Sequence, residues 1–335
     1  MKELSYVLIN PYTMHKSRTG GVINRLLSRS SQLDLVGARM FAPSEELVNE
    51  FVDVMTPGPG PLSPEAEEVF QHIVTYVQQS YMPDASGKRR RVMLLLIEGD
   101  DAVRILNDEV VGSVIRQTTG ETIRDTYGDF ITDANGNVAY FEPAVLTAST
   151  RESALKGIDV WLKHADTDSG VLYDVMAYDD DSDVQSTLVM IKPDSLSSSR
   201  TRAGAVIDLF SKTGLRIIGV KLFSMTVAQA VEFYGPVREV FVKKFADRVR
   251  DRIAAALGNE FDFPVDDAII DQAAHSLTEP NADYEFGRIV KFMTGHTPSE
   301  TPPEEWSTRG SERCLALVYQ GRKAIEKIRT QLGST

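Results

Sequence analysis

The chain repeats one pattern of strand, turn and helix, and this repeat limits its possible folds more than any other sequence feature. Residues 7–29, VLINPYTMHKSRTGGVINRLLSR, match residues 189–212, VMIKPDSLSSSRTRAGAVIDLFSK. Further on, LDLVGARMFA at 33–42 aligns without a gap to LRIIGVKLFS at 215–224, and the offset in both stretches is 182 residues. Self-similarity of this kind indicates a duplicated structural unit.

A third match follows at a larger offset. RVMLLLIEGDDAVRILN at 91–107 matches RCLALVYQGRKAIEKIR at 313–329, and here the offset is 222 residues. The rise from 182 to 222 places about 40 extra residues in the second copy. Thr335 then aligns with Ser113, so we expect the second copy to be incomplete at its C-terminal end.

These offsets predict the domain boundaries. We expect a first domain at 1–165, an acidic linker at 166–185 and a second domain at 186–335. The linker is assigned from its acidic clusters and its Gly and Ser residues. The extra residues fall at about 235–280 and have the apolar spacing of helices, which favours packing or an oligomer contact over chemistry.

Composition narrows the class of protein. The 335 residues are 42% hydrophobic and 25% charged, which is typical of a globular chain with room for two domains. The net charge of -12 argues against sequence-independent binding to nucleic acid and against binding to an anionic membrane. No signal-peptide core and no membrane-spanning run is found, so we expect a cytoplasmic protein. Its single cysteine, Cys314, lies in an apolar run and is expected to be a buried thiol.

The coarse pattern of each copy predicts an α+β fold. A short strand, a turn, a helix and a second strand are followed by a polar helical stretch and then by another strand-turn-helix unit. Copy one adds a strand near 138–147 and a helix at 150–165. Strands joined in this way favour a compact α+β sandwich over a doubly wound sheet.

Lys192 is the residue that a buried-strand interpretation leaves unexplained. It ends the apolar run of copy two and is followed by Pro193 and Asp194. Such a lysine can project into water, or it can bind a phosphate on a rigid turn next to a helix N-terminus. Arg200 in the turn and Gly204 at the helix entry favour the phosphate site.

These motifs together resemble the nucleoside-diphosphate kinase family. The resemblance rests on I-K-P-D at 191–194, the G-x-V-I-x-x-F helix, the strand L-R-I-I-G-V-K, Phe233-Tyr234 and the segment L-V-Y-Q-G-R-K-A-I-E-K-I-R-T-Q-L-G-S-T. It covers copy two from about residue 187, apart from the insertion, and copy one from about 5 to 165 in weaker form. The resemblance implies two ferredoxin-like βαββαβ domains, each an antiparallel sheet flanked by helices.

The resemblance also implies a reaction. Members transfer a γ-phosphoryl group from a nucleoside triphosphate to a nucleoside diphosphate through a phosphohistidine, with Mg²⁺ on the phosphates. It thus implies nucleoside di- and triphosphates as ligands, and it suggests a homo-oligomer. Such a transfer needs an in-line nucleophile and cations on the phosphate oxygens.

Carried over residue by residue, the resemblance proposes a nucleotide site in copy two. Lys192 falls at the phosphate-binding lysine, Arg329 at the first phosphate arginine and Thr335 at the threonine that contacts phosphate. Tyr234 falls at the tyrosine near the nucleophile. The base-stacking aromatic falls at Phe286 or at its neighbour Tyr284.

Copy one has lost much of this chemistry. Its segment GETIRDTYGDF keeps Arg124 at the second phosphate arginine, but Leu146 stands where the family has its histidine. Asn10 replaces the lysine and Asn107 replaces the first arginine. An aliphatic side chain cannot accept a phosphoryl group, and the lost cations remove charge neutralisation. We therefore predict that copy one is catalytically dead.

Copy two keeps its cations, but its histidine segment would begin after Thr335. Among the five histidines of the chain, His164 in H-A-D-T-D-S imitates the family's H-G-S-D-S. It follows the helix of Trp161, where the family has no nucleophile, so we do not expect it to be the nucleophile. We expect each of the other four histidines to be solvated or to cap a helix. No catalytic histidine and no protein-held metal are predicted.

Two hypotheses follow. The first is a tandem nucleoside-diphosphate kinase whose histidine lies beyond the 335 residues, so that the chain as given is inactive. The second is a non-catalytic protein whose two copies serve nucleotide binding or oligomer assembly.

Overall fold

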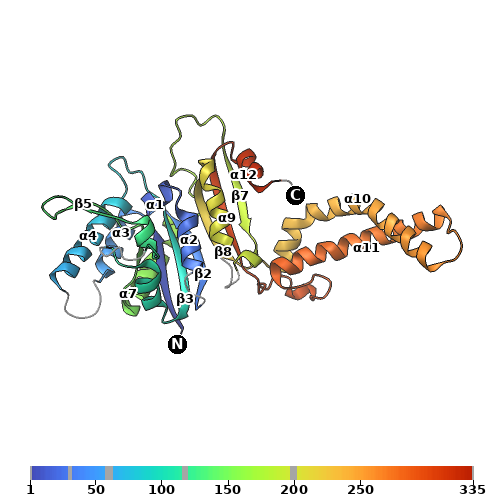
Figure 1. Ribbon diagram of the computed structural model, residues 1–335, viewed down its shortest axis with the longest axis horizontal. Coiled ribbons are helices and arrows are strands. Elements are labelled where there is room, and N and C mark those ends of the chain that lie inside the picture. The colour runs from blue at the N-terminus through green and yellow to red at the C-terminus, as the bar shows by residue number, and fades with distance from the viewer. Residues whose placement is uncertain (1, 29–31, 57–62, 115–119, 197–201, 334–335) are drawn as a thin grey trace. The chain divides into compact units, whose positions relative to one another are not determined.

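The chain forms two compact units. The computed structural model describes residues 2–28, 32–56, 63–114, 120–196 and 202–333 (Figure 1). One unit comprises Met1–Phe223 together with Leu315–Thr335, and the other comprises Ser224–Cys314. The strands of both sequence copies therefore belong to the first unit, and the insertion lies in the second.

A seven-stranded sheet runs through the first unit. Its order is β6-β1-β3-β2-β8-β9-β7. The antiparallel pairs include β1 with β3 and β6, β2 with β3 and β8, and β7 with β9. The strands are β1 (Lys2–Ile9), β2 (Leu33–Phe41), β3 (Val92–Asp100), β6 (Val145–Thr147), β7 (Val184–Ile191), β8 (Arg216–Phe223) and β9 (Cys314–Arg322).

The order of the strands confirms the predicted α+β fold with an antiparallel sheet. Copy one contributes β6-β1-β3-β2, which places its fourth, first, third and second strands side by side, the order of a ferredoxin-like βαββαβ sheet. Copy two contributes β8-β9-β7, its second, third and first strands in the same relative order. The two copies thus share one continuous sheet.

Helices cover both faces of this sheet (Figure 1). One core contains residues of α2 (Thr19–Ser28), α9 (Arg202–Leu209) and α12 (Ala324–Leu332). The other core contains residues of α3 (Glu45–Val54), α4 (Pro64–Tyr81) and α7 (Arg151–Lys163). The strands contribute side chains to both cores, because successive side chains of a strand point to opposite faces of the sheet. In β3, Met93 and Leu95 belong to the first core, and Val92 and Leu94 belong to the second.

The junction of the two copies is nearly symmetric. In the β2–β8 pair, Arg39 lies opposite Lys221, its own counterpart at an offset of 182. In the α2–α9 pair, a methyl group on Gly20 would collide with the backbone of Asp208, and one on Gly204 would collide with the backbone of Asn24. This reciprocity is typical of a two-fold interface.

The helix crossing corrects one detail of the repeat. Gly20 corresponds to Gly204 and Asn24 to Asp208, so the offset within this helix is 184 rather than the predicted 182. Copy two has two more residues before the helix and two fewer after it. The change is visible in the sequence once a gap is allowed, because Gly-x-Val-Ile recurs at 20–23 and 204–207.

The acidic segment between the copies is partly buried. The carboxylate of Asp168, at the end of α8 (Ala165–Asp168), accepts a hydrogen bond from Ser44 N at 2.7 Å and pairs with Arg89 at 3.0 Å. The backbone of Leu172 donates to Ile218 O at 2.9 Å. Residues 166–185 therefore contact both copies and are not simply solvated.

A kink divides the strand that was predicted near 138–147. The structure has β5 (Val138–Glu142), which pairs with β4 (Asp129–Thr132), and the separate strand β6, which pairs with β1. Between β5 and β6, Ala144 has a φ of 60°, a left-handed conformation that strands do not use. The alternating pattern alone did not reveal this break.

The second unit is a helical hairpin. Its two helices are α10 (Val227–Glu260) and α11 (Asp267–Thr294), capped by Thr226 and Asp266. Ion pairs such as Arg250 with Asp271, at 2.7 Å, link them. None of the helices in the described part of the chain combines the length and the apolar run that crossing a bilayer requires.

The remaining short helices complete the first unit. They include α1 (Pro11–His15), α5 (Ala102–Arg104), a π-helix (Ile105–Val111), α6 (Ile123–Tyr127) and the 3₁₀ turns Pro193–Ser195 and Ser211–Thr213. The second unit adds the 3₁₀ turn Pro303–Glu305. Gly214 ends the α9 region in a left-handed conformation, as expected of a glycine after a helix.

Candidate functional site

Lys192 lies immediately after β7, on a rigid turn. Its backbone is extended, its side chain is exposed, and Pro193 behind it is buried and opens the 3₁₀ turn Pro193–Ser195. Because proline fixes its own φ and restricts the residue before it, the direction of the lysine backbone is set locally. An exposed ammonium held in this way is available to an anionic ligand.

Arg329 lies in the last turn of α12 and is also exposed. It belongs to the first unit, as Lys192 does. Thr335, the third predicted phosphate contact, lies outside the described residues.

The two predicted aromatic contacts lie in the hairpin unit. Tyr234 is half-buried on α10, and burial raises the pKa of its hydroxyl. On α11, Phe286 is 7% exposed, whereas Tyr284 is 67% exposed. Of the two alternatives for base stacking, Tyr284 therefore has the ring that a ligand could reach.

In copy one, the position of the nucleophile is part of the core. Leu146 lies on β6 opposite Leu8, is 3% exposed and belongs to the same core as Phe41 and Trp161. Its side chain is packed among apolar groups and offers no atom for phosphoryl transfer.

A closed hydrogen-bond network surrounds Asn10, which replaces the lysine of copy two. The Asn10 side chain is fully buried, donates from Nδ2 to Glu142 Oε1 at 3.1 Å and accepts from the Tyr81 hydroxyl at 2.7 Å. The Tyr76 hydroxyl donates to Glu142 Oε2 at 2.7 Å, and Ala144 N donates to Oε1 at 3.0 Å. Burial raises the pKa of Glu142 by more than these hydrogen bonds lower it.

Asn107 and Arg124, the remaining copy-one residues that align with family phosphate contacts, line the same cavity. Asn107, on the π-helix, and Arg124, on α6, both line a cavity of about 300 Å³ with Ser149. The Arg124 guanidinium donates to Gly112 O at 2.9 Å and to Val145 O at 3.2 Å, so it supports the backbone. Its Nε is buried without a hydrogen-bond partner among the described residues, and burial lowers the pKa of the guanidinium to about 10.

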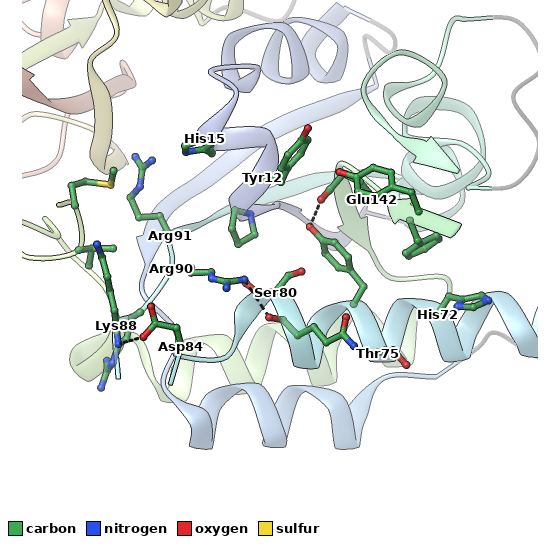
Figure 2. Close-up of a pocket in the computed structure, with 18 of the residues that line it drawn as sticks. Tyr12, His15, His72, Thr75, Ser80, Asp84, Lys88, Arg90, Arg91 and Glu142 are labelled. Atoms are coloured by element: carbon green, nitrogen blue, oxygen red, sulfur yellow. Dashed lines mark hydrogen bonds between the residues drawn. The ribbon is translucent and has the colours of Figure 1, made fainter. Parts of the chain in front are cut away.

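A larger cavity, of about 840 Å³, lies on the other side of α4 (Figure 2). Its lining includes Lys88–Arg91 ahead of β3, α1 residues Tyr12 and His15, and Tyr140 and Glu142 from β5. Figure 2 shows Lys88, Arg90 and Arg91 along one side of this cavity, apart from His72 and Thr75. Sequence reasoning missed it, although the run of four basic residues at 88–91 is a visible signal.

His164 is buried beside α3. It caps the C-terminal end of α7, is 6% exposed, and its Nε2 lies 3.2 Å from Glu50 Oε2. Glu46 lies close enough to join them around a cation. Lys163, however, already pairs with Glu50 and supplies the positive charge there.

Three solved structures with a partial likeness are nucleoside diphosphate kinases. The Aquifex aeolicus enzyme is 21% identical, with a TM-score of 0.32 over 48% of this chain and 94% of that one. The Borrelia burgdorferi enzyme, solved with vanadate and ADP, is 15% identical, with a TM-score of 0.34 over 54% and 94%. The Pyrobaculum aerophilum enzyme is 18% identical, with a TM-score of 0.35 over 48% and 96%.

Two sequence comparisons show the same similarity in part of the chain. Residues 185–256 match the family model described as nucleoside diphosphate kinase. A nucleoside diphosphate kinase of Methanococcus maripaludis is 24% identical over 152 residues, which is 45% of this chain and 68% of that protein. The family-model match includes β7, Lys192, α9 and β8. Part of the chain is therefore similar to the nucleoside diphosphate kinase family.

Proposed function

We propose that the second copy binds nucleoside di- and triphosphates, with Lys192 and Arg329 on the phosphates and Mg²⁺ arriving with the nucleotide. The observation that carries this proposal is the family-model match over 185–256, which contains the lysine and its proline-fixed turn. Both cations are exposed at the ends of different elements. Exposed cations can form charge-assisted hydrogen bonds with the oxygens of an anionic ligand.

The proposed chemistry is that of the family. A γ-phosphoryl group would move from a triphosphate to a histidine and then to a diphosphate, while the cations neutralise the phosphate oxygens. None of the five histidines in the 335 residues stands at the family's nucleophile position, and in copy one that position is the buried Leu146. We therefore propose that residues 1–335 alone bind nucleotide without accepting the phosphoryl group.

A non-catalytic role is the second candidate. It is favoured by the closed network at Asn10, where a carboxylate and two tyrosines occupy the surroundings of the lost lysine. Such a site cannot neutralise a phosphate, yet the sheet around it is complete.

Nucleotide titration tests the proposed binding site. We expect ADP to bind by calorimetry, and Lys192→Ala and Arg329→Ala each to raise Kd by about tenfold or more, the effect of one charge-assisted contact. Lys212→Ala is the matched control, because Lys212 is an exposed cation on a different turn of the same unit. Unchanged affinity in both site variants would refute the assignment.

A labelling experiment tests the proposed lack of transfer. The 335-residue protein is incubated with γ-labelled ATP and Mg²⁺, and bound phosphate is assayed for stability in acid and base. We expect no acid-labile, base-stable label. Its appearance would show that a histidine within these residues serves as the nucleophile.

A further inference from the structure

The cavity of about 840 Å³ beside α4 is not lined by Asn107, Arg124, Lys192 or Arg329, although Asn10 donates to Glu142 in its wall. Asn107 and Arg124 line the smaller cavity, and Lys192 and Arg329 belong to the second copy. A volume of this size is typical of sites for small organic ligands. What such a site binds depends on the groups along its wall.

One end of this cavity is cationic. Lys88 and Arg90 are exposed, and the Arg90 guanidinium donates to the carbonyl oxygens of Gln79 and Ser80 at the end of α4. Arg91 is 6% exposed and donates to the carbonyl of Ile217. Within the described residues, none of these three side chains forms an ion pair with a carboxylate, whereas Arg89 is neutralised by Asp168.

Further cations surround His15, which also lines this cavity. Arg216 donates to the backbone carbonyl of His15 at 2.7 Å. Burial lowers the pKa of the His15 imidazole, and Arg216, Lys16 and Arg91 lower it further. A histidine surrounded by cations indicates a positive potential, which attracts anions.

The carboxylates along the wall are already occupied. Glu142 accepts hydrogen bonds on both oxygens, from Asn10 and Ala144 on one and from Tyr76 on the other. The Asp84 carboxylate accepts hydrogen bonds from Ser86 and from the backbone N–H of Lys88, and so stabilises the turn at 84–88. Among the described residues neither carboxylate forms an ion pair with Lys88, Arg90 or Arg91. Hydrogen bonds from Ser86 and Lys88 lower the pKa of Asp84, and Arg90 lowers it further, so Asp84 offsets only part of the positive charge.

The other end of the cavity is aromatic. Tyr12, Tyr76, Tyr140 and Phe141 line it, and Tyr140 is 41% exposed. Tyrosine rings give large contact area at low cost in conformational entropy and stack on planar groups. The wall therefore offers cations for an anion and rings for a flat ligand.

We propose that this cavity is a second ligand site, for a small molecule that carries a phosphate-type anion and a planar ring. The anion binds Lys88 and Arg90, and the ring lies among Tyr12, Tyr76 and Tyr140. The site is independent of the proposed nucleotide site in copy two.

The test uses AMP as the probe, with inorganic phosphate and adenosine as its two halves. It is performed on a Lys192→Ala/Arg329→Ala background, so failure of the proposed function does not affect the outcome. We expect saturable one-to-one binding of AMP by calorimetry, with both halves at least about tenfold weaker because each makes only part of the contacts. No saturable binding of AMP would overturn the proposal.

Two further substitutions locate the site. On the same background, Lys88→Ala and Tyr140→Ala should each raise the Kd for AMP by roughly fivefold to tenfold. Lys212→Ala should leave it unchanged, and Lys88→Ala should unfold at the temperature of the parent because Lys88 is exposed. Tyr140 is partly buried and hydrogen-bonds Tyr12, so thermal unfolding checks that the Tyr140→Ala variant is folded. AMP binding that neither cavity variant weakens would overturn the assignment, and phosphate that binds as tightly as AMP would overturn the role of the rings.

Discussion

Asn10 and Lys192 occupy the same place after the first strand of each copy, and their surroundings differ completely. Lys192 is exposed on its turn, whereas Asn10 is buried between Tyr81 and Glu142. An amide can donate and accept at once, which a lysine cannot, so it joins a hydroxyl donor to a carboxylate acceptor. The two counterpart positions thus differ: one side chain is exposed on a turn and the other belongs to a buried hydrogen-bond network.

Glu142 should make the stability of the first unit depend on pH. Burial raises its folded pKa above the ordinary value of 4.5, so the folded state retains a proton that the unfolded state has lost. Stability contributed by this group should therefore fall as pH rises from about 4.5 through the raised pKa. Removing the titrating group should remove that part of the pH dependence.

Glu142→Gln is the variant that checks this effect. Gln has no proton to lose, so its free energy of unfolding relative to that of the wild type should increase as pH rises through the same window. Urea unfolding across pH 4 to 8 gives the comparison. A constant difference across that range would contradict the raised pKa, and Glu98→Gln at the sheet surface provides the control, because Glu98 pairs with Lys2 in solvent.

Helices and strands of the repeat could be predicted because their apolar residues recur with the period of each element. The helix offset of 184 needed only a gapped comparison, whereas the strand break at Ala144 and the large cavity depend on tertiary contacts. The cavity combines residues from Pro11 to Ala177, and no local pattern can bring such distant residues together. The strand and turn at Lys192, by contrast, could be predicted because strand, lysine and proline are adjacent in sequence, whereas phosphate binding by Lys192 stays a prediction.

The crossing of α2 and α9 requires glycine on both helices. A Cβ on Gly20 or Gly204 would overlap the backbone of the facing helix, which cannot move aside as a flexible side chain can. We expect Gly20→Ala and Gly204→Ala each to destabilise the first unit by about 1–3 kcal/mol, measured by urea unfolding.

Gly258→Ala is the opposing control for these glycines. Gly258 lies on α10, and no atom would lie within 4 Å of an added Cβ. Alanine is the better helix former, so this variant should be neutral or should stabilise the hairpin by up to about 1 kcal/mol. A similar change at all three positions would show that helix propensity, not the crossing, controls the effect.

At the scale of the whole molecule, the two copies are not independent bodies. One core takes residues from both, including Ile23 and Leu35 of copy one and Ile207 and Ile217 of copy two. The sheet crosses the junction through β2 and β8. Separating the copies would expose half of this core and one strand edge, and both favour association.

This geometry predicts that a fragment of residues 1–170 forms a homodimer. The junction is reciprocal, so a second copy-one fragment can take the place of copy two, with Gly20 of each chain against Asn24 of the other. Arg39 would then face Arg39, where Lys221 now lies, and the like charges should make the dimer stronger at higher salt. Light scattering should give about twice the fragment mass, while Gly20→Leu should abolish the dimer by blocking the helix crossing. A folded monomer at every concentration would show that the core of copy one closes without a partner.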